Sequence, residues 1–273
     1  MKNFLKYYTK DRLVLAYKEY QLKRIKNVEP ILVFTMAKVG SSSVYSSLKR
    51  CTNIPTFHIH SLDEEEANRN IKLCFDHGVY PGSRTPVFLI NKEVIEKNKP
   101  YKIISLFRNP IERNISAFFE AFQYHTGSSI RNYTGSILDL EKIYHKRLLH
   151  FYPIEWYDKQ FKDGTGINVF DLPFDKEKGY LITKYKDTEL LLINSSLNDK
   201  IKETTIRDFC RVEHFELKNI NVTEKSNVSL LYTEFKNKIR FSEEYLSCLL
   251  DTKYMNHFFP EKEKERLFNK WVK

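Results

Sequence analysis

Short apolar runs predict buried strands in this chain. Residues 31–34 (ILVF) and 101–107 (YKIISLF) are largely apolar, which is typical of parallel strands covered on both faces. Residues 56–60 (TFHIH) alternate, with Phe57 and Ile59 on one face of a predicted strand and two histidines on the other. The first and second apolar runs each lead into a turn and then a helical pattern, which favours an α/β fold.

Patterns of the same kind extend along the rest of the chain. Residues 61–78 contain an acidic run suited to a helix N-terminus, and residues 136–151 have apolar side chains at helical spacing. Residues 180–183 and 189–193 are rich in β-formers and predict a hairpin or a pair of sheet strands. From Ser229 onward the periodicity is helical again.

Together these elements predict one domain over residues 1–273, with a P-loop-like three-layer α/β fold in which helices flank a central, mainly parallel sheet. Residues 1–28 are expected to form an N-terminal helix, and residues 126–174 a helical insertion or lid. A chain of 273 residues with 41% hydrophobic residues is long enough to bury a substantial core.

The formal net charge of +10 indicates an anionic partner, such as a phosphate- or sulfate-bearing molecule, an acidic glycan, a membrane surface or a nucleic acid. No helix-turn-helix, zinc-finger or RNA-recognition spacing occurs, so we expect no nucleic-acid partner. The basic segment 3–27 has Leu13, Tyr17 and Tyr20 at helical spacing. This pattern is compatible with packing on its own domain or with peripheral contact to an anionic membrane.

The sequence has neither an apolar run long enough for a membrane span nor a signal-peptide pattern. We therefore expect a cytoplasmic protein, with any peripheral membrane contact at the inner face. Its four cysteines form no CxxC pair, which fits reduced thiols. The lack of an anchor, with abundant Lys, Asn, Ile and Tyr, favours a bacterial source.

The turn after residues 31–34 has the composition of a phosphate-binding loop, Lys-x-Gly-Ser-Ser-Ser, with Val39 between Lys38 and Gly40. Gly40 lets backbone amides approach an anion closely, and Lys38 adds a full charge. Hydroxyls follow at the positive end of the next helix, on Ser41, Ser42 and Ser43. A Walker loop has its lysine directly after the second glycine, so the order here favours a different phosphate loop; the alternative is a serine-rich helix cap.

A second candidate anion site follows residues 101–107. Arg108 stands at the end of that predicted strand, and Asn109 with Pro110 opens a helix as its cap and first-turn proline. The apolar stripe of this helix leaves Ser116 on another face, where its hydroxyl and the Arg108 guanidinium can share one phosphate. Taken separately, Arg108 could instead form a salt bridge and Ser116 could instead face the core.

His58 and His60 are two residues apart in a predicted strand, so both imidazoles project from the same face. A lone histidine here would more often be structural than catalytic. A metal pair is another interpretation, but no third and fourth ligand at suitable spacing accompanies it, and we expect no metal.

These three segments resemble sulfotransferases that use 3′-phosphoadenosine 5′-phosphosulfate (PAPS). The 38–43 turn is similar to their 5′-phosphosulfate loop, although Ala37 replaces a frequent proline, and RNPIERNIS at 108–116 is similar to their 3′-phosphate segment. TFHIH resembles the His-x-His segment of heparan sulfate 2-O-sulfotransferases. The resemblance implies that His60 is the catalytic base, that His58 supports it or orients the substrate, and that Lys38 assists the departing group.

Three segments of the second half resemble a bacterial family labelled putative capsular polysaccharide synthesis proteins. They are residues 151–158 (FYPIEWYD), 166–180 and 257–259 (HFF). That family has a lysine near the position of Lys225, which implies a donor contact on the adenosine side, although the aromatic residues that usually follow are missing. A surface loop capping the next helix is the alternative for this segment.

We therefore expect transfer of a sulfonate group from PAPS, which leaves PAP, to a hydroxyl of a carbohydrate. The acceptor would be a surface or capsular polysaccharide, acidic or lipid-linked. Trp156 can stack on a sugar ring, and His150 or Glu155 can hydrogen-bond its hydroxyls, although aromatic residues at such spacing are more often core.

Three other functions compete with this expectation. A P-loop kinase acting on a sugar or nucleotide would need an acidic residue at a strand end for magnesium. Neither the strand predicted at 101–107 nor the one at 56–60 ends in such a residue. A non-catalytic glycan- or membrane-binding protein would keep the loop without turnover. A glycosyltransferase would commonly have an Asp-x-Asp motif, which the sequence lacks.

Overall fold

The computed structural model describes residues 2–24, 28–76, 86–218 and 227–273. The chain divides into two compact units, each assembled from stretches that are separate in sequence. Unit 1 comprises Met1–Phe107, Asp158–Asn168 and Tyr180–Lys218, and unit 2 comprises Arg108–Tyr157, Val169–Gly179 and Asn219–Lys273. The expectation of one domain with an insertion at 126–174 stays a prediction.

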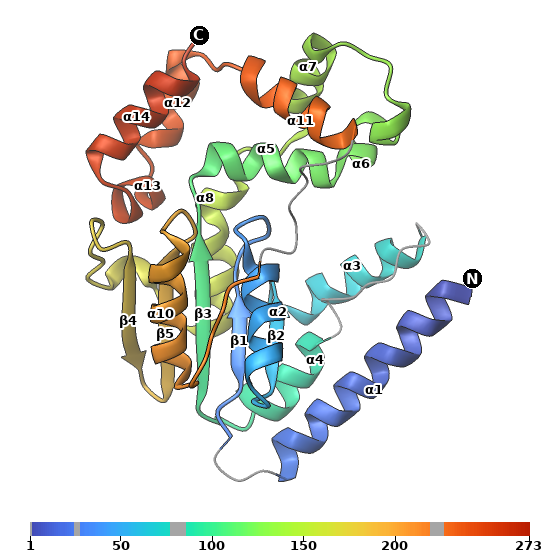
Figure 1. Cartoon of the computed structure of the whole chain (residues 1–273), viewed down its shortest axis with the longest axis vertical. Coiled ribbons are helices and arrows are strands. Elements are labelled where there is room, and N and C mark those ends of the chain that lie inside the picture. The colour runs from blue at the N-terminus through green and yellow to red at the C-terminus, as the bar shows by residue number, and fades with distance from the viewer. Residues whose placement is uncertain (1, 25–27, 77–85, 219–226) are drawn as a thin grey trace. The chain divides into compact units, whose positions relative to one another are not determined.

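Unit 1 is built around a five-stranded sheet of order β2-β1-β3-β5-β4 (Figure 1). Its strands are β1 (Ile31–Phe34), β2 (Thr56–Ile59), β3 (Tyr101–Phe107), β4 (Tyr180–Tyr185) and β5 (Thr188–Asn194). All neighbouring strands are parallel except β4 and β5, which form an antiparallel hairpin. The predicted α/β class and mainly parallel sheet are confirmed, and so is the hairpin.

Helices cover this sheet on both faces, since every residue of β1 is completely buried. α2 packs on β1 and β2, and α4 packs on β2. The helical segments of unit 1 are α1 (Lys2–Arg24), α2 (Ser41–Cys51), α3 (Glu64–Asp76), α4 (Pro86–Ile90), η2 (Asn91–Ile95), α9 (Asp163–Thr165) and α10 (Asp199–Cys210). A π-helical turn, η4 (Tyr157–Lys162), precedes α9.

The strand order places a topological switch point at β1. The chain runs from β1 outward to β2 and then returns to β3 on the other side of β1. In open α/β sheets, ligands bind outside the carboxyl ends of the strands at such a point. The register pairs Phe34 with Ile59, so the loop after β1 and the residues after β2 leave the sheet at the same end.

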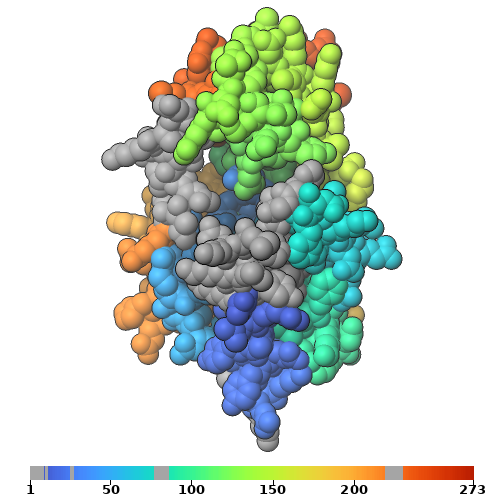
Figure 2. Space-filling model, turned by 90° about the vertical axis from the view of Figure 1, so that its right-hand side faces the viewer, coloured from blue at the N-terminus to red at the C-terminus, as the bar shows by residue number. Residues whose placement is uncertain are grey.

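The predicted N-terminal helix is present as α1, which lies between α2 and the α4–η2 segment on the face drawn in Figure 2. Two hydrogen bonds near its C-terminus hold it there: the Gln21 side chain donates to the carbonyl of Asn53 at 2.9 Å, and the Lys99 side chain donates to the backbone carbonyl of Leu22 at 2.7 Å. The apolar stripe noted in the sequence faces solvent instead. Its exposed side chains are Leu13, Tyr17 and Tyr20.

Unit 2 is helical and has an aromatic core. Phe118 lies at its centre, with its ring centroid 5.7 Å from that of Phe235 and 5.4 Å from that of Tyr144. The helices are α5 (Pro110–Glu120), α6 (Phe122–Thr126), α7 (Ile137–Arg147), α8 (Tyr152–Trp156), α11 (Asn227–Lys238), α12 (Glu243–Leu250), α13 (Lys253–Phe258) and α14 (Glu261–Trp271), with short 3-10 turns η3 (Ile130–Asn132) and η5 (Val169–Asp171). The helix predicted at 136–151 ends at Arg147, and the helical C-terminal part is confirmed.

Among the described helices, none combines the length and the apolar character that a membrane crossing needs.

Candidate active site

The loop from Thr35 to Gly40 connects β1 to α2 and has an unusual backbone. Lys38 has φ of +70° and Gly40 has φ of +85°, both in the left-handed region. Non-glycine residues adopt this region at an energetic cost, and turns of this type can direct successive amide groups toward an anion. A Cβ on Gly40 would have no atom within 4 Å, so the backbone conformation, and not lack of space, favours glycine.

The start of α2 supplies hydroxyl groups and no negative charge. Gly40 is its N-cap, and the first turn contains no acidic residue, so the positive helix end is not neutralised locally. Ser41 is buried, whereas Ser42 and Ser43 are half-buried, as is Lys38 in the preceding loop. The left-handed turn and the helix end without a negative charge favour anion binding here, which stays a prediction.

His58, in β2, is tied to the first residue of α2. Its Nε2 is hydrogen-bonded to Oγ of Ser41 at 2.9 Å, and its ring stacks on Tyr45 with centroids 5.5 Å apart. Burial, reinforced by the neighbouring His60, lowers the pKa of His58 to about 3. His58 is thus neutral near pH 7 and positions a loop hydroxyl; it is too weak a base to hold a proton there.

His60 follows β2 and reaches across to the end of β1. Its Nδ1 donates to the carbonyl of Thr35 at 2.6 Å, which fixes the tautomer of the neutral ring and leaves the lone pair on Nε2. The two imidazoles lie on the same side of β2, as the alternation predicted, with centroids 4.8 Å apart and planes at 79°. Nε2 is therefore the nitrogen of His60 that can accept a proton in this tautomer, and its role as a base stays a prediction.

In unit 2, Arg108 is held at the start of α5. The hydroxyl of Tyr254 donates to the carbonyl of Arg108 at 2.8 Å, and the Arg108 guanidinium contacts Oε2 of Glu112 at 3.2 Å. Asn109 caps α5 by accepting from the Glu112 amide, as its sequence predicted. Ser116, one turn beyond Glu112, is half-buried.

Glu112 is the shared anion of a cationic cluster. Besides Arg108, it contacts Lys270 at 2.9 Å and Lys236 at 3.5 Å. Burial alone would raise the pKa of the Glu112 carboxyl, but the Lys270 hydrogen bond and the charges of Lys236 and Arg108 outweigh it and lower the pKa to about 2. Three basic side chains thus converge on one carboxylate within unit 2.

The predicted acceptor residues have different surroundings from those expected. Trp156 is only 1% exposed and packs edge-on against Tyr157, so its indole belongs to the core of unit 2. Both ring nitrogens of His150 are engaged, Nδ1 with the hydroxyl of Tyr245 and Nε2 with the carbonyl of Tyr144. Neither side chain is arranged to contact a sugar, whereas Glu155 is exposed. Lys225 lies outside the described residues.

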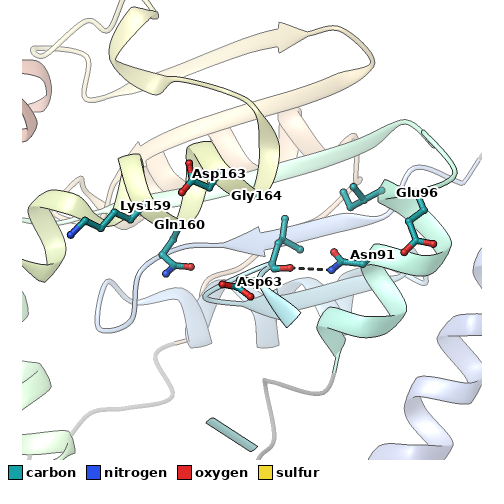
Figure 3. A pocket seen from close by; sticks show the side chains of 9 residues that line it. Asp63, Asn91, Glu96, Lys159, Gln160, Asp163 and Gly164 are labelled. Carbon is teal, nitrogen blue, oxygen red and sulfur yellow. Dashed lines mark hydrogen bonds between the residues drawn. The ribbon is translucent and has the colours of Figure 1, made fainter. Parts of the chain in front are cut away.

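Sequence reasoning missed a cavity of about 440 Å³ in unit 1 (Figure 3). Its wall begins at Leu62 and Asp63, two and three residues after His60, and continues with residues of η2, η4 and α9. Two of these segments are π-helical, and a π-helical turn gives no regular hydrophobic spacing from which it could be predicted. Among the described residues, no group of three or more His, Cys, Asp or Glu side chains is placed to hold a metal ion.

A comparison with protein families matches residues 131–260 to a family described as "Putative capsular polysaccharide synthesis protein". Neither a search of curated proteins nor a search of solved structures gives a significant match. The matched segment includes β4, β5 and much of unit 2, but neither the loop after β1 nor Arg108. The match therefore supports a role connected with polysaccharides and does not bear on the loop and histidine segments.

Proposed function

We propose that the protein transfers a sulfonate group from PAPS to a hydroxyl group of a carbohydrate. One observation carries the proposal: His60 donates to the carbonyl of Thr35, the residue at which the anion-binding loop begins. That hydrogen bond joins a candidate base to a candidate donor loop inside unit 1. The family match over residues 131–260 supports the carbohydrate as acceptor.

The proposed reaction needs one proton acceptor and a stabilised leaving group. The acceptor oxygen attacks sulfur and forms the new S–O bond, while the bond from sulfur to the bridging oxygen breaks and its electron pair leaves with PAP. The hydroxyl proton moves to Nε2 of His60. The Lys38 ammonium offsets the negative charge that develops on the bridging oxygen.

The remaining donor contacts follow from the sequence motifs. Hydroxyls of Ser41, Ser42 and Ser43, with the amide of Val39 in the left-handed turn, would hold the 5′-phosphate. Arg108 and Ser116 are assigned to the 3′-phosphate, and Lys225 to the adenosine side, on the resemblance. The Arg108 guanidinium can exchange its Glu112 contact for a phosphate because both partners are anionic.

The decisive experiment removes the basic nitrogen of His60 while preserving its hydrogen bond. His60→Asn still offers an N–H to the Thr35 carbonyl but cannot accept a proton. We expect transfer of radiolabelled sulfate from PAPS to bacterial surface polysaccharide to fall at least about 100-fold. The Kd for PAP should change less than about twofold, because the proposal assigns the donor phosphates to other residues. His214→Asn, an exposed histidine of unit 1, is the matched control.

Other results would contradict the proposal. Wild-type transfer by His60→Asn would remove His60 as the base. A rise in melting temperature with ATP and Mg²⁺, but none with PAP, would favour the kinase alternative. Stabilisation by polysaccharide alone would favour the non-catalytic alternative.

A further inference from the structure

The cavity that follows β2 has the size and lining of a ligand site. Its volume of about 440 Å³ lies within the range of roughly 300–1,000 Å³ typical of small-molecule sites. Figure 3 shows Asp63 on the loop after β2, Asn91 and Glu96 on and beside η2, and Lys159, Gln160 and Asp163 on the η4–α9 segment. All of these residues belong to unit 1.

The lining is rich in groups that hydrogen-bond hydroxyls. Carboxylates accept hydrogen bonds, and carboxamides both donate and accept, so the three carboxylates and two carboxamides match a ligand with many hydroxyls. Within the described residues, the side chains of Glu96, Gln160 and Asp163 make no hydrogen bond or ion pair with the protein. Their polar atoms are therefore not already used in holding the fold.

The charge of the lining is opposite in sign to that of the whole chain. Three carboxylates and one ammonium leave two formal negative charges around the cavity, whereas the chain carries +10. An anionic sugar placed there would face carboxylates. Each carboxylate about 6 Å from a bound anion lowers its affinity about threefold in a dielectric near that of water. The cavity therefore favours an uncharged ligand over a uronate or a sulfated sugar.

Hydrogen bonds hold the residues on one side of the cavity in position. Asn91 Nδ2 donates at 3.0 Å both to the carbonyl of Leu62 and to Oε1 of Glu64, which fastens η2 to the loop after β2. Asp63 caps α3 by accepting from the amides of Glu65 and Glu66. These bonds hold one wall of the cavity in place.

The opposite wall packs closely against this loop. A Cβ on Gly164 would lie 3.1 Å from Cβ of Leu62, so glycine lets α9 approach the loop more closely than a residue with a side chain would. Phe161, in η4, stacks on Phe34 with ring centroids 5.3 Å apart. Because Phe34 is the last residue of β1, this contact fixes η4 at the carboxyl end of the sheet.

The cavity also lies near the proposed base. Leu62 follows His60 by two residues, which span at most about 7 Å of chain. The Phe34 contact anchors η4 beside the strand that leads into the Lys38 loop. A sugar bound in the cavity would thus sit at the end of the sheet where His60 and the anion loop are found.

From these observations we infer that the cavity is the acceptor site and that it takes an uncharged, hydroxyl-rich sugar unit. The role of acceptor rests on the proposed sulfonate transfer, whereas the binding of the sugar does not. The unit would present one hydroxyl toward His60, while the planar polar side chains bind the others. An acidic polysaccharide would then have to offer a neutral residue to the site.

The test uses the full chain and saturation-transfer NMR titrations of three probes: methyl glucoside, methyl N-acetylglucosaminide and methyl glucuronide. We expect at least one neutral glycoside to bind in the millimolar range and the glucuronide to bind at least about threefold more weakly. Gln160→Ala and Asp163→Ala should each weaken the neutral probe about fivefold, as loss of one hydrogen bond does. Asp187→Ala, an exposed aspartate in the β4–β5 turn, is the control.

Asp163→Asn separates charge from hydrogen bonding. It should raise the affinity for glucuronide and leave that for the neutral probe within about twofold. Melting temperatures of all variants verify folding. Failure of every probe to bind, or unchanged affinities in Gln160→Ala and Asp163→Ala, would overturn the inference.

A parallel PAP titration distinguishes the two proposals. Sugar binding that responds to the cavity variants, in a protein that does not bind PAP, would sustain the sugar site and reject sulfonate transfer. If the cavity variants change neither PAP binding nor sulfate transfer, sulfonate transfer would be sustained and the cavity would be rejected as the acceptor site.

Discussion

Glu112 should be one of the largest single electrostatic contributors to the stability of unit 2. The fall in the pKa of its carboxyl from an ordinary 4.5 to about 2 corresponds to about 3 kcal/mol of favourable free energy for the ionised form. Glu112→Gln keeps the shape of the side chain and removes the charge. We expect it to lower the free energy of unfolding at pH 7 by about 2–3 kcal/mol.

The sign of the pH dependence follows from the direction of the shift. Between pH 4.5 and pH 2 the unfolded chain binds a proton at Glu112 that the folded protein does not, so stability increases with pH over this interval. The contribution is complete above about pH 5.5 and disappears as the pH falls through 2. The difference between wild type and Glu112→Gln should therefore shrink on acidification.

Urea unfolding followed by tryptophan fluorescence measures this effect directly. Both tryptophans of the chain, Trp156 and Trp271, are 1% exposed and lie in unit 2, so the signal reports on that unit. Glu234→Gln is the matched control, because its pair with Lys238 is about half exposed and should be worth less than about 0.5 kcal/mol. A loss below 1 kcal/mol for Glu112→Gln at pH 7, or a loss that does not depend on pH, would refute the reasoning.

Three further predictions concern the proposed donor site and α1. Arg108→Gln should weaken the affinity for PAP about 10- to 100-fold in calorimetric titrations. The affinity for adenosine 5′-phosphosulfate, which has no 3′-phosphate, should stay within about twofold, and equal losses of affinity for both would contradict the assignment. Gly40→Ala should lower the free energy of unfolding by about 1–2 kcal/mol because φ is +85°, and Gly40→Asn should lower it less. Equal melting temperatures of the two variants would argue against backbone strain. Leu13→Glu with Tyr17→Glu should reduce sedimentation with phosphatidylglycerol vesicles without lowering the melting temperature, since both side chains are exposed; unchanged sedimentation would exclude this face of α1 from membrane contact.

The sequence was most informative where a local pattern determines structure. The strands at 31–34 and 101–107 were predicted to the residue because short, largely apolar runs bounded by turn residues are typical of strands in a buried sheet. The common face of His58 and His60 followed from strand alternation. Asn109 as the cap of α5 followed from its position before Pro110.

What the sequence missed depends on tertiary contacts. Helical spacing alone could not tell that the stripe at Leu13 faces solvent, because α1 packs through hydrogen bonds from its polar side. Trp156 was a candidate for stacking on a sugar, with the core as the more frequent alternative, and only its tertiary contacts show that it lies in the core. The cation cluster at Glu112 joins residues up to 158 positions apart, which no local pattern records.

The hydrogen bond between His58 and Ser41 makes His58 a spectroscopic probe of the loop after β1. Because the imidazole stays uncharged over the whole physiological pH range, its nitrogen resonances respond to the hydroxyl they touch and not to titration. Isotope labelling of histidine alone would thus make occupancy of the neighbouring loop visible in spectra, without a dye or a coupled assay. Nucleotide analogues could then be ranked on the unmodified chain before any acceptor has been found.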